Sequence, residues 1–373
     1  MFLAKHDLER VSRLYANDRG KEILAMCGLE RRDFLKGASA VVGTMMVGFP
    51  RQFDSLAEEG NIGKVDPLAP DIFFHVGDLS RGLCNNGWVI FEDYVLVIDA
   101  NFPLGAKELL PKIRAVTDKP IRFAFDTHHH GDHCYGNQTW VENGATPLAH
   151  TGVIDEMKRY ETGYYEDKPG RWDESAKERP DVKASRLKPP SLLFPKELFF
   201  DDGKHRVELL HLGIAHTHGD ALAWLPKERI LFSGDVCVNG PYNYVGDGNV
   251  DKWIATLDAA RKLGAQVVCP GHGSRGQESL LKDQQDFFQA IYKQVDALVR
   301  TKKSPQEVQN SVSKVRQDLL EQAGIARYIG DDFPAQVEKV YNEMTGEHFP
   351  ASRQTAQAAR CQHAHDHGLM LVA

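Results

Sequence analysis

The chain has 373 residues, of which 42% are hydrophobic and 26% are charged, and this composition is typical of a globular protein with a full core. Its formal net charge of -7 argues against binding to nucleic acid, because proteins that bind nucleic acid usually carry a basic patch. The six cysteines include no Cys-x-x-Cys pair, so no disulfide scaffold is indicated, whereas the sixteen clustered histidines favour metal binding.

Residues 1–57 are expected to form an export leader. The pair Arg31-Arg32 precedes an apolar run over 37–49, and a small-residue cleavage pattern follows at 55–57. This order resembles a twin-arginine signal, and the run is too short to span a bilayer, which needs about 20 apolar residues. The prediction is a bacterial protein that the twin-arginine export machinery delivers to the periplasm or another extracytoplasmic compartment. An amphipathic helix with an accidental arginine pair is the alternative, and the sequence leaves open whether the leader is cleaved or kept as an anchor.

The chain becomes rich in strand patterns after residue 70. Apolar runs bounded by turn residues predict strands, and Asn86-Gly87 is a dipeptide expected to turn the chain just before one of them. Apolar residues three and four positions apart predict a helix. In chain order, the first half is expected to contain strands at 72–76, 88–91, 94–98 and 121–125, a helix at 103–116, a helical segment at 134–143 and a strand at 147–149.

Residues 151–196 differ from their surroundings. They contain several prolines, many charges and the aromatic residues Tyr160, Tyr164, Tyr165 and Trp172, with little periodicity. Loops of this length inside a compact domain are usually functional or disordered. We expect a partly helical insertion or lid, and a solvated surface excursion is the alternative.

The second half repeats the alternation of strands and then becomes helical. Asp201-Asp202-Gly203 is expected to turn a hairpin, and Pro305 and Pro334 stand where the first turn of a helix tolerates proline. The expected strands are 198–200, 206–212, 221–225, 229–232 and 266–269, and the expected helices are 249–263, 278–299, 305–322 and 334–344.

The patterns predict four parts. The leader at 1–57 is followed by a catalytic domain at 58–300, which includes the insertion at 151–196. A helical extension occupies 301–350. The remaining tail at 351–373 contains several histidines and is expected to be disordered rather than part of the site.

One stretch concentrates potential metal ligands directly after the strand expected at 121–125. Imidazole and carboxylate groups both bind zinc. Along an extended chain, His128 and His130 point to the same side and can bind one ion, whereas His129 points elsewhere. Asp132 and His133, just beyond them, can reach a second ion nearby. The four candidate ligands are His128, His130, Asp132 and His133.

Three further segments offer ligands in the second half of the chain. Each follows an apolar strand and contains glycine, and α/β folds place their ligands at such strand ends. The segments are Gly213-Ile214-Ala215-His216-Thr217-His218-Gly219-Asp220, Ser233-Gly234-Asp235 and Pro270-Gly271-His272-Gly273.

Together with Thr127-His128-x-His130-x-Asp132-His133, these segments resemble the motifs of the metallo-β-lactamase-fold hydrolase superfamily. The resemblance implies an α/β (α+β) fold, the αββα sandwich, in which helices flank two sheets and the site lies at one sheet edge. It also implies two zinc ions per chain. One zinc would be bound by His128, His130 and His216, the second by Asp132, His133 and His272, and Asp235 would bridge both.

Other polar residues near these motifs are given different roles. His218 is an alternative to His216, but the Gly-x-x-His-Thr spacing favours His216. Asp220 is expected to orient ligands through hydrogen bonds, and His129 to support the site or lie at the surface. Structural or buried roles are expected for His205, His211, Cys134, Cys237 and Cys269.

The resemblance implies a metal-dependent hydrolase. A hydroxide held between zinc ions about 3.5–4 Å apart would be the nucleophile, and Asp132 would orient it and move a proton. The substrate would be a small molecule with an ester, lactone, thioester or amide bond. The best-known zinc β-lactamases resemble this chain in their histidines but place cysteine or serine at the position of Asp235, so β-lactam cleavage is expected only as a secondary activity. Tyr242 and Tyr244 either donate to a substrate oxyanion or pack as loop residues.

Two other functions remain open. One is a mononuclear iron persulfide dioxygenase, which shares part of the motif set. The presence of all seven candidate ligands argues against it, because one iron needs only three protein ligands. A metal-binding or partner protein with little turnover is a third reading, in which the C-terminal helices would serve assembly. The sequence does not indicate the oligomeric state.

Overall fold

The computed structural model describes residues 61–350 of the chain. The leader expected at 1–57 and the tail expected at 351–373 therefore lie outside the described residues, and the twin-arginine signal stays a prediction. Between residues 61 and 350, none of the helices combines the length and the apolar character needed to cross a membrane.

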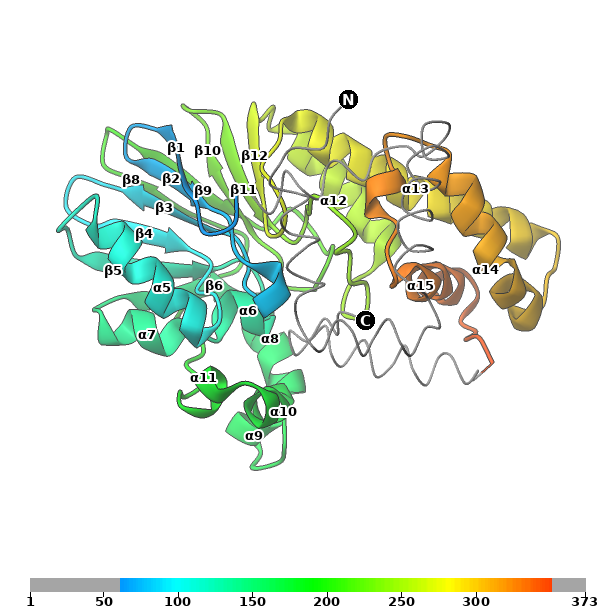
Figure 1. Ribbon diagram of the computed structural model, residues 1–373, viewed down its shortest axis with the longest axis horizontal. Coiled ribbons are helices and arrows are strands. Elements are labelled where there is room, and N and C mark those ends of the chain that lie inside the picture. Colours follow the sequence, from blue (N-terminus) through cyan, green and yellow to red (C-terminus); the bar gives the residue numbers. More distant parts are fainter. Residues whose placement is uncertain (1–60, 351–373) are drawn as a thin grey trace, which may run out of the picture. The chain divides into compact units, whose positions relative to one another are not determined.

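The first of two β-sheets contains seven strands that follow one another in chain order (Figure 1). The first four strands pair antiparallel and the last four pair parallel. All four residues of β4 are buried, as expected for a central strand with other layers on both faces. The strands are β1 (Val65–Ala69), β2 (Ile72–His75), β3 (Asn86–Ile90), β4 (Val95–Ile98), β5 (Ile121–Asp126), β6 (Thr146–His150) and β7 (Leu192–Phe194).

The second sheet contains five strands in the order β12-β11-β10-β9-β8. Strands β8 to β11 pair antiparallel, and β12 lies parallel beside β11. The hairpin expected at Asp201-Asp202-Gly203 joins β8 to β9. The strands are β8 (Glu197–Asp201), β9 (Arg206–Leu210), β10 (Leu222–Leu225), β11 (Ile230–Gly234) and β12 (Val267–Pro270).

Helices cover the outer faces of the two sheets. In the first half lie η1 (Leu79–Arg81), α5 (Pro103–Arg114), α6 (Gly131–Cys134) and α7 (Asn137–Glu142). The insertion contains α8 (Thr151–Tyr160), α9 (Thr162–Tyr165), α10 (Arg171–Glu178) and α11 (Pro180–Lys183). The second half adds α12 (Val250–Lys262), α13 (Glu278–Arg300), α14 (Pro305–Leu320), η2 (Ala326–Tyr328) and α15 (Phe333–Thr345).

Of the four apolar cores within residues 61–350, three separate these layers. The central core lies between the sheets and includes Phe125 of the first sheet and Phe232 of the second. A second core packs Leu109 of α5 against the outer face of the first sheet. A third packs α12 to α15 against the second sheet, with Trp253 and Phe288 in contact. The order helix, sheet, sheet, helix confirms the αββα sandwich predicted from the sequence.

The C-terminal helices also support the loop between β11 and α12. On α15, the side-chain amide of Gln336 donates to the carbonyl of Asn243 at 2.8 Å. Glu343 accepts from the backbone N–H of Val250 at 3.0 Å and so caps the start of α12 together with Asn249. This extension therefore holds a loop that carries site residues described below.

One turn prediction was wrong. Asn86 and Gly87 belong to β3, where they pair with His75 and Phe74 of β2. The glycine is needed for close packing rather than for a turn, because a Cβ atom at Gly87 would lie 2.3 Å from Cε1 of Phe232. The chain reverses earlier, near η1, where Gly82 adopts a left-handed conformation.

The helical segment expected at 134–143 is confirmed in part, because α7 lies within it. The structure has two short helices, α6 and α7, on either side of Tyr135 and Gly136. A Cβ atom at Gly136 would lie 2.2 Å from the carbonyl oxygen of Ala100, so the glycine allows a close backbone approach where the helices part. The short edge strands β1 and β7 were not expected from the sequence.

Candidate metal centre

The candidate ligands gather at one edge of the two sheets, on the segments that follow β5, β9, β11 and β12. His128 and His130 lie in the short segment after β5, and His133 lies in α6. His216 follows β9, and Asp235 directly follows β11. Residues from both halves of the chain, up to His272 after β12, thus converge on a single site.

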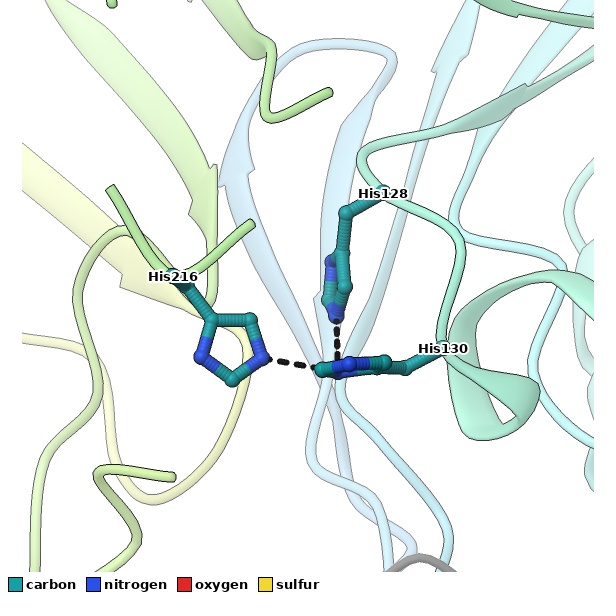
Figure 2. Close-up of side chains that lie close together, drawn as sticks. All are labelled: His128, His130 and His216. Atoms are coloured by element: carbon teal, nitrogen blue, oxygen red, sulfur yellow. Dashed lines mark hydrogen bonds between the residues drawn. The ribbon is translucent and has the colours of Figure 1, made fainter. Parts of the chain in front are cut away.

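Three imidazoles meet in the three-histidine cluster, which consists of His128, His130 and His216 (Figure 2). Nδ1 of His130 lies 3.2 Å from Nε2 of His128 and 2.8 Å from Nε2 of His216. Zn–N bonds of about 2.0–2.1 Å in tetrahedral geometry would place ligand nitrogens about 3.3 Å apart. The three nitrogens are therefore spaced as the ligands of one metal ion are.

The tautomers of His130 and His216 follow from the hydrogen-bond partners of the ring nitrogens that face away from the cluster. Nε2 of His130 lies 2.9 Å from a carboxylate oxygen of Asp247, and Nδ1 of His216 lies 2.9 Å from the carbonyl oxygen of Tyr244. Both partners only accept hydrogen bonds, so both of these nitrogens carry protons. The inward-facing nitrogen of each ring then presents a lone pair.

The same argument applies to His128 through a longer chain of hydrogen bonds. The hydroxyl of Thr127 donates to Asp99 at 2.8 Å, so its oxygen accepts from Nδ1 of His128 at 3.1 Å. Nε2 of His128 is then unprotonated. Three lone pairs face one another with no proton between them, an arrangement that a bound cation stabilises. This donor set fits a divalent metal ion.

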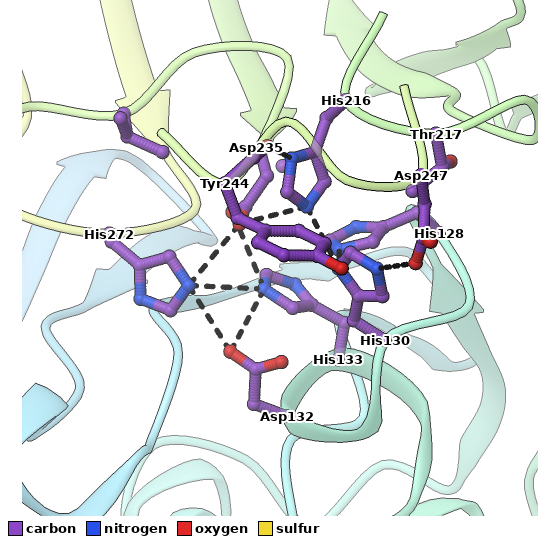
Figure 3. A network of polar contacts seen from close by, with 12 residues as sticks. His128, His130, Asp132, His133, His216, Thr217, Asp235, Tyr244, Asp247 and His272 are labelled. Carbon is purple, nitrogen blue, oxygen red and sulfur yellow. Dashed lines mark hydrogen bonds and ion pairs between the residues drawn. The ribbon is translucent and has the colours of Figure 1, made fainter. Parts of the chain in front are cut away.

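The mixed cluster consists of Asp132, His133 and His272 (Figure 3). Nε2 of His272 lies 3.1 Å from Oδ2 of Asp132 and 3.4 Å from Nε2 of His133. Nδ1 of His133 lies 3.0 Å from Asp99, which leaves its Nε2 directed toward the cluster. One carboxylate and two imidazoles are again a donor set suited to zinc.

Asp235 lies between the two clusters. Its carboxylate is 3.5 Å from Nε2 of His216 and 3.4 Å from Nε2 of both His133 and His272. Gly271 makes room for it, because a Cβ atom there would lie 1.9 Å from Oδ1 of Asp235. The structure thus brings together all seven residues predicted as ligands, with Asp235 placed to contact both clusters.

The electrostatics of the three-histidine cluster favour neutral imidazoles. Burial lowers the pKa of His128 well below its usual value, and the neighbouring histidines lower it further. Burial also lowers the pKa of His130 to about 3, although Asp247 opposes the shift. Burial likewise lowers the pKa of His216, with Asp235 opposing. Neutral imidazole is the form that binds metal.

The mixed cluster behaves in the opposite way. Burial alone would lower the pKa of His272, but Asp235 and Asp132 outweigh burial and raise it to about 9. The pKa of His133 is also raised despite burial, because Cys84 and several carboxylates lie close to its ring. Burial would raise the pKa of Asp132, but His133 and His272 hold it well below its usual range. The groups of this cluster therefore pair as imidazolium and carboxylate.

Backbone strain accompanies this arrangement at Asp99. The residue follows β4 with a φ of +63°, a left-handed conformation that costs free energy for a residue with a Cβ atom and is often found at functional sites. The backbone N–H and hydroxyl of Thr127 both donate to Asp99, and its second oxygen faces His133. Asp99 therefore orients one histidine of each cluster, since Thr127 in turn contacts His128.

The remaining predicted residues lie outside the clusters. His129 is buried rather than at the surface, with its ring stacked on Tyr160 at 5.4 Å. His218 is 45% exposed and faces Glu156. Asp220 accepts from the N–H and the hydroxyl of Thr217 and so fixes the turn next to His216. His205 lies beside Glu228, and His211 contacts the carbonyl of Asp220, so both have structural positions. Three cysteines near the motifs are buried and free: Cys134, Cys237 and Cys269.

Tyr244 and Tyr242 lie beside the two clusters. The ring centroid of Tyr244 is 5.6 Å from that of His130 and 6.1 Å from that of His216. The ring of Tyr242 is 6.3 Å from that of His272. Each tyrosine therefore flanks one cluster.

Sequence reasoning missed Asp99, Asp247 and Arg171. Asp99 directly follows the strand expected at 94–98, and a carboxylate at a strand end of the ligand-bearing edge is itself a signal. Asp247 lies in a loop, and Arg171 lies in the insertion 76 residues away from it. Neither position has a pattern from which this pairing follows.

A sequence model described as the metallo-beta-lactamase superfamily matches residues 79–272, which are more than half of the chain. The chain belongs to the metallo-beta-lactamase superfamily. At the level of this superfamily, the relationship supports a metal-dependent hydrolase.

Relatives in the metallo-beta-lactamase superfamily match parts of the chain. A metallo-beta-lactamase type 2 of Pseudomonas aeruginosa is 31% identical over 83 residues, covering 21% of this chain and 33% of that protein. A linear primary-alkylsulfatase of a Pseudomonas species is 26% identical over 197 residues, covering 45% and 37%. The chain thus spans about a third of the length of these two relatives. A metallo-beta-lactamase structure from Pontibacter korlensis covers 61% of this chain and 98% of its own, with a TM-score of 0.50 and 18% identity, which supports the fold alone.

Proposed function

We propose that the protein is a dinuclear zinc hydrolase of a small molecule that contains an ester, lactone, thioester or amide bond. The observation that carries this proposal is the convergence of three unprotonated imidazole nitrogens beside a second donor set, with Asp235 between them. His128, His130 and His216 would hold one ion, and Asp132, His133 and His272 the other. Bound zinc supplies a water of lowered pKa, about 7, and polarises the bond to be cleaved.

The chain's own groups have three roles in this proposal. Asp132, which is partly exposed, accepts a proton from the attacking water at its carboxylate and passes it to the leaving group. Thr127, Asp99 and Asp247 hold the histidine rings in the required tautomers, as groups that contact metal ligands commonly do. Tyr242 and Tyr244 line the approach to the clusters and position the substrate.

The substrate class is proposed from the superfamily and from the relatives. Those relatives are described as a lactamase and an alkylsulfatase, so the bonds they cleave differ and do not single out one for this chain. A hydrolysis panel should therefore contain an ester, a lactone, a thioester, a β-lactam and an alkyl sulfate. We expect the ester, lactone or thioester to react fastest, and the β-lactam to react weakly.

Metal analysis is the direct test. Protein purified without added metal should contain about two zinc ions per chain, and Asp235→Ala should contain fewer. One iron per chain, together with oxygen-dependent turnover of a persulfide, would overturn the hydrolase in favour of the dioxygenase. Full metal loading without hydrolysis of any member of the panel would favour the binding protein with little turnover.

Export by the twin-arginine pathway is proposed separately. Its support is the order of the arginine pair, the apolar run and the small-residue pattern in residues 1–57. Replacement of Arg31 and Arg32 by lysine should retain the protein in the cytoplasm of a bacterial host, whereas the unchanged chain should reach the periplasmic fraction. Equal periplasmic amounts of both proteins would contradict the proposal.

A further inference from the structure

The insertion at 151–196 reaches the metal centre through Arg171, at the start of α10. The guanidinium of Arg171 contacts both carboxylate oxygens of Asp247, at 2.6 Å from Nη1 and 3.1 Å from Nη2. The same carboxylate lies 2.9 Å from Nε2 of His130. A fork of this kind is a strong, directional contact, so Arg171 fixes the carboxylate that in turn fixes a ring of the three-histidine cluster.

Tyr160, at the end of α8, forms a second contact between the insertion and this region. Its ring lies beneath the guanidinium of Arg171 at 3.6 Å and stacks on His129 with 6° between the ring planes. His129 stands between the two predicted ligands of the segment after β5. The cation–π contact and the stacking therefore connect the insertion to the backbone that carries His128 and His130.

Glu161 forms a third contact. It is buried, and one of its carboxylate oxygens accepts from the hydroxyl of Tyr135, the residue that directly follows α6. The other oxygen accepts from the backbone N–H of Trp172 at 2.7 Å, next to Arg171. The start of α10 is thus tied to the segment that carries Asp132 and His133. The insertion is therefore packed against the ligand segment.

The contacts of Asp247 argue against a third metal ion at this place. His129, His130 and Asp247 offer atoms close enough to hold an ion. However, the guanidinium of Arg171 already supplies a positive charge to both carboxylate oxygens. The Arg171–Asp247 pair therefore acts as a fixed part of the protein that positions a ligand.

From these contacts we infer that Arg171 is a positioning residue for the metal centre, acting through Asp247 on His130, and that docking of the insertion and metal binding stabilise each other. The inference rests on the metal site proposed above. Thermodynamic coupling is reciprocal. If the docked insertion raises metal affinity, metal binding must raise the stability of the docked insertion by the same factor.

The first experiment measures zinc affinity by competition with a chromophoric chelator, without substrate. Removal of groups that orient metal ligands typically lowers metal affinity 10- to 100-fold. The zinc affinity of Asp247→Asn should therefore fall by a factor in this range, and that of Arg171→Met should fall about tenfold. Arg171→Lys keeps the charge but cannot contact both oxygens of Asp247 as a guanidinium does. Its zinc affinity should lie between those of wild type and Arg171→Met. Lys177→Met is the matched control, because Lys177 lies on the same helix, is exposed and pairs with Glu174 of that helix rather than with a residue of the metal centre. Its zinc affinity should be that of wild type.

A double-mutant cycle separates positioning from general destabilisation. If Arg171 acts through Asp247, the double variant Arg171→Met/Asp247→Asn should bind zinc no more weakly than Asp247→Asn alone. Additive losses would overturn the proposed route. If Arg171→Met does not fold, Arg171→Lys still decides the matter, because wild-type affinity in that folded variant contradicts a role for the fork.

The second experiment measures whether zinc binding stabilises the docked insertion. Hydrogen exchange of the amides in 160–172 should slow when zinc is added to the wild-type protein, by about the factor by which Arg171→Met weakens zinc binding. The same amides in Arg171→Met should respond less to zinc. Tight zinc binding without any change in this exchange would contradict the inference but leave the proposed function intact, whereas absence of zinc binding by wild type would overturn both.

Discussion

The three-histidine cluster and the mixed cluster are neighbours that both contact Asp235, but the charges of their own groups differ. Burial keeps the first cluster neutral, with the pKa of His130 lowered to about 3. Carboxylates make the second cluster a set of ion pairs, with the pKa of His272 raised to about 9 despite burial. A metal ion entering the first cluster meets lone pairs, whereas one entering the second must displace protons.

If the protein holds two zinc ions as proposed, this difference would give their affinities a different dependence on pH. Metal binding to protonated ligands releases protons and therefore depends on pH. The supporting contacts differ as well, because Asp247 and Arg171 support only the three-histidine cluster, whereas Asp99 contacts His133 directly and His128 through Thr127. The first cluster is therefore expected to fill first at neutral pH.

The largest effect is expected from removal of the group that contacts both clusters. Asp235→Ala should reduce zinc from about two ions per chain to one and lower hydrolysis on the order of 10³-fold, because a metal ion supplies several kcal/mol of transition-state stabilisation. Metal analysis and initial rates measure the two effects. Asp258→Ala, an exposed carboxylate that pairs with Lys262 on α12, is the control, and two tightly bound zinc ions in Asp235→Ala would refute the bridging position.

The pH dependence of zinc affinity should separate the clusters most clearly. Because His133 and His272 must both lose a proton, affinity for the second ion should rise up to about 100-fold per pH unit from pH 6.5 toward the pKa of about 9 of His272. Affinity for the first ion should change little over that range, since its ligands are already neutral. Chelator competition at several pH values measures both, and parallel pH slopes for the two ions would remove the distinction.

A smaller effect is expected from crowding Asp235 without removing it. In Gly271→Ala the new methyl group would lie 1.9 Å from Oδ1 of Asp235, so the carboxylate must move. Affinity for the second ion should fall about 10- to 100-fold, as after other losses of ligand orientation, and more than affinity for the first. Gly324→Ala has nothing within 4 Å of the added atom and should match wild type; equal losses at both ions in Gly271→Ala would contradict the expected selectivity.

The smallest effect concerns the stability of protein prepared without metal. His272 has a raised pKa, so its contribution to the free energy of unfolding is complete below pH 6.5 and lost as pH rises through about 9. His130 has a pKa lowered to about 3, so stability is lost as pH falls from 6.5 toward 3. Urea denaturation should show a maximum in the free energy of unfolding near pH 6.5 and a decline toward both pH 3 and pH 9. His272→Gln should reduce the alkaline loss, to which His133 with its raised pKa also contributes, and keep the acid one.

The sandwich and the seven candidate ligands were expected because four local motifs of the sequence resemble those of the metallo-β-lactamase-fold superfamily. The ligands stand directly after apolar strands, and strand ends of the two sheets meet at one edge. The contacts that orient those ligands were not predictable in the same way. Asp247 and Arg171 meet only after the insertion has packed against the loop after β11, and that packing has no signature in spacing or periodicity.

The insertion shows the same limit at the level of secondary structure. Helix α8 buries Val153 and Met157 at helical spacing, so part of the expected helix could be read from the sequence. Helices α9 and α11 have only four residues each, too few for a periodic pattern. Their positions depend on contacts such as that of Asp181 with the backbone of Leu104, which lies far away in the chain.

The side chain of Asn85 joins the two ends of the matched region, and this has a consequence for the timing of folding. Its amide donates to the carbonyls of Pro270 and Gly273 at 2.8 Å, across more than 180 residues of sequence. Contacts of such long range form slowly, because the intervening chain must first be ordered. We expect the ligand-bearing segments of the two halves to come together late during refolding. Zinc uptake should therefore lag behind the formation of helices and strands and would serve as a measure of the contact between the two halves.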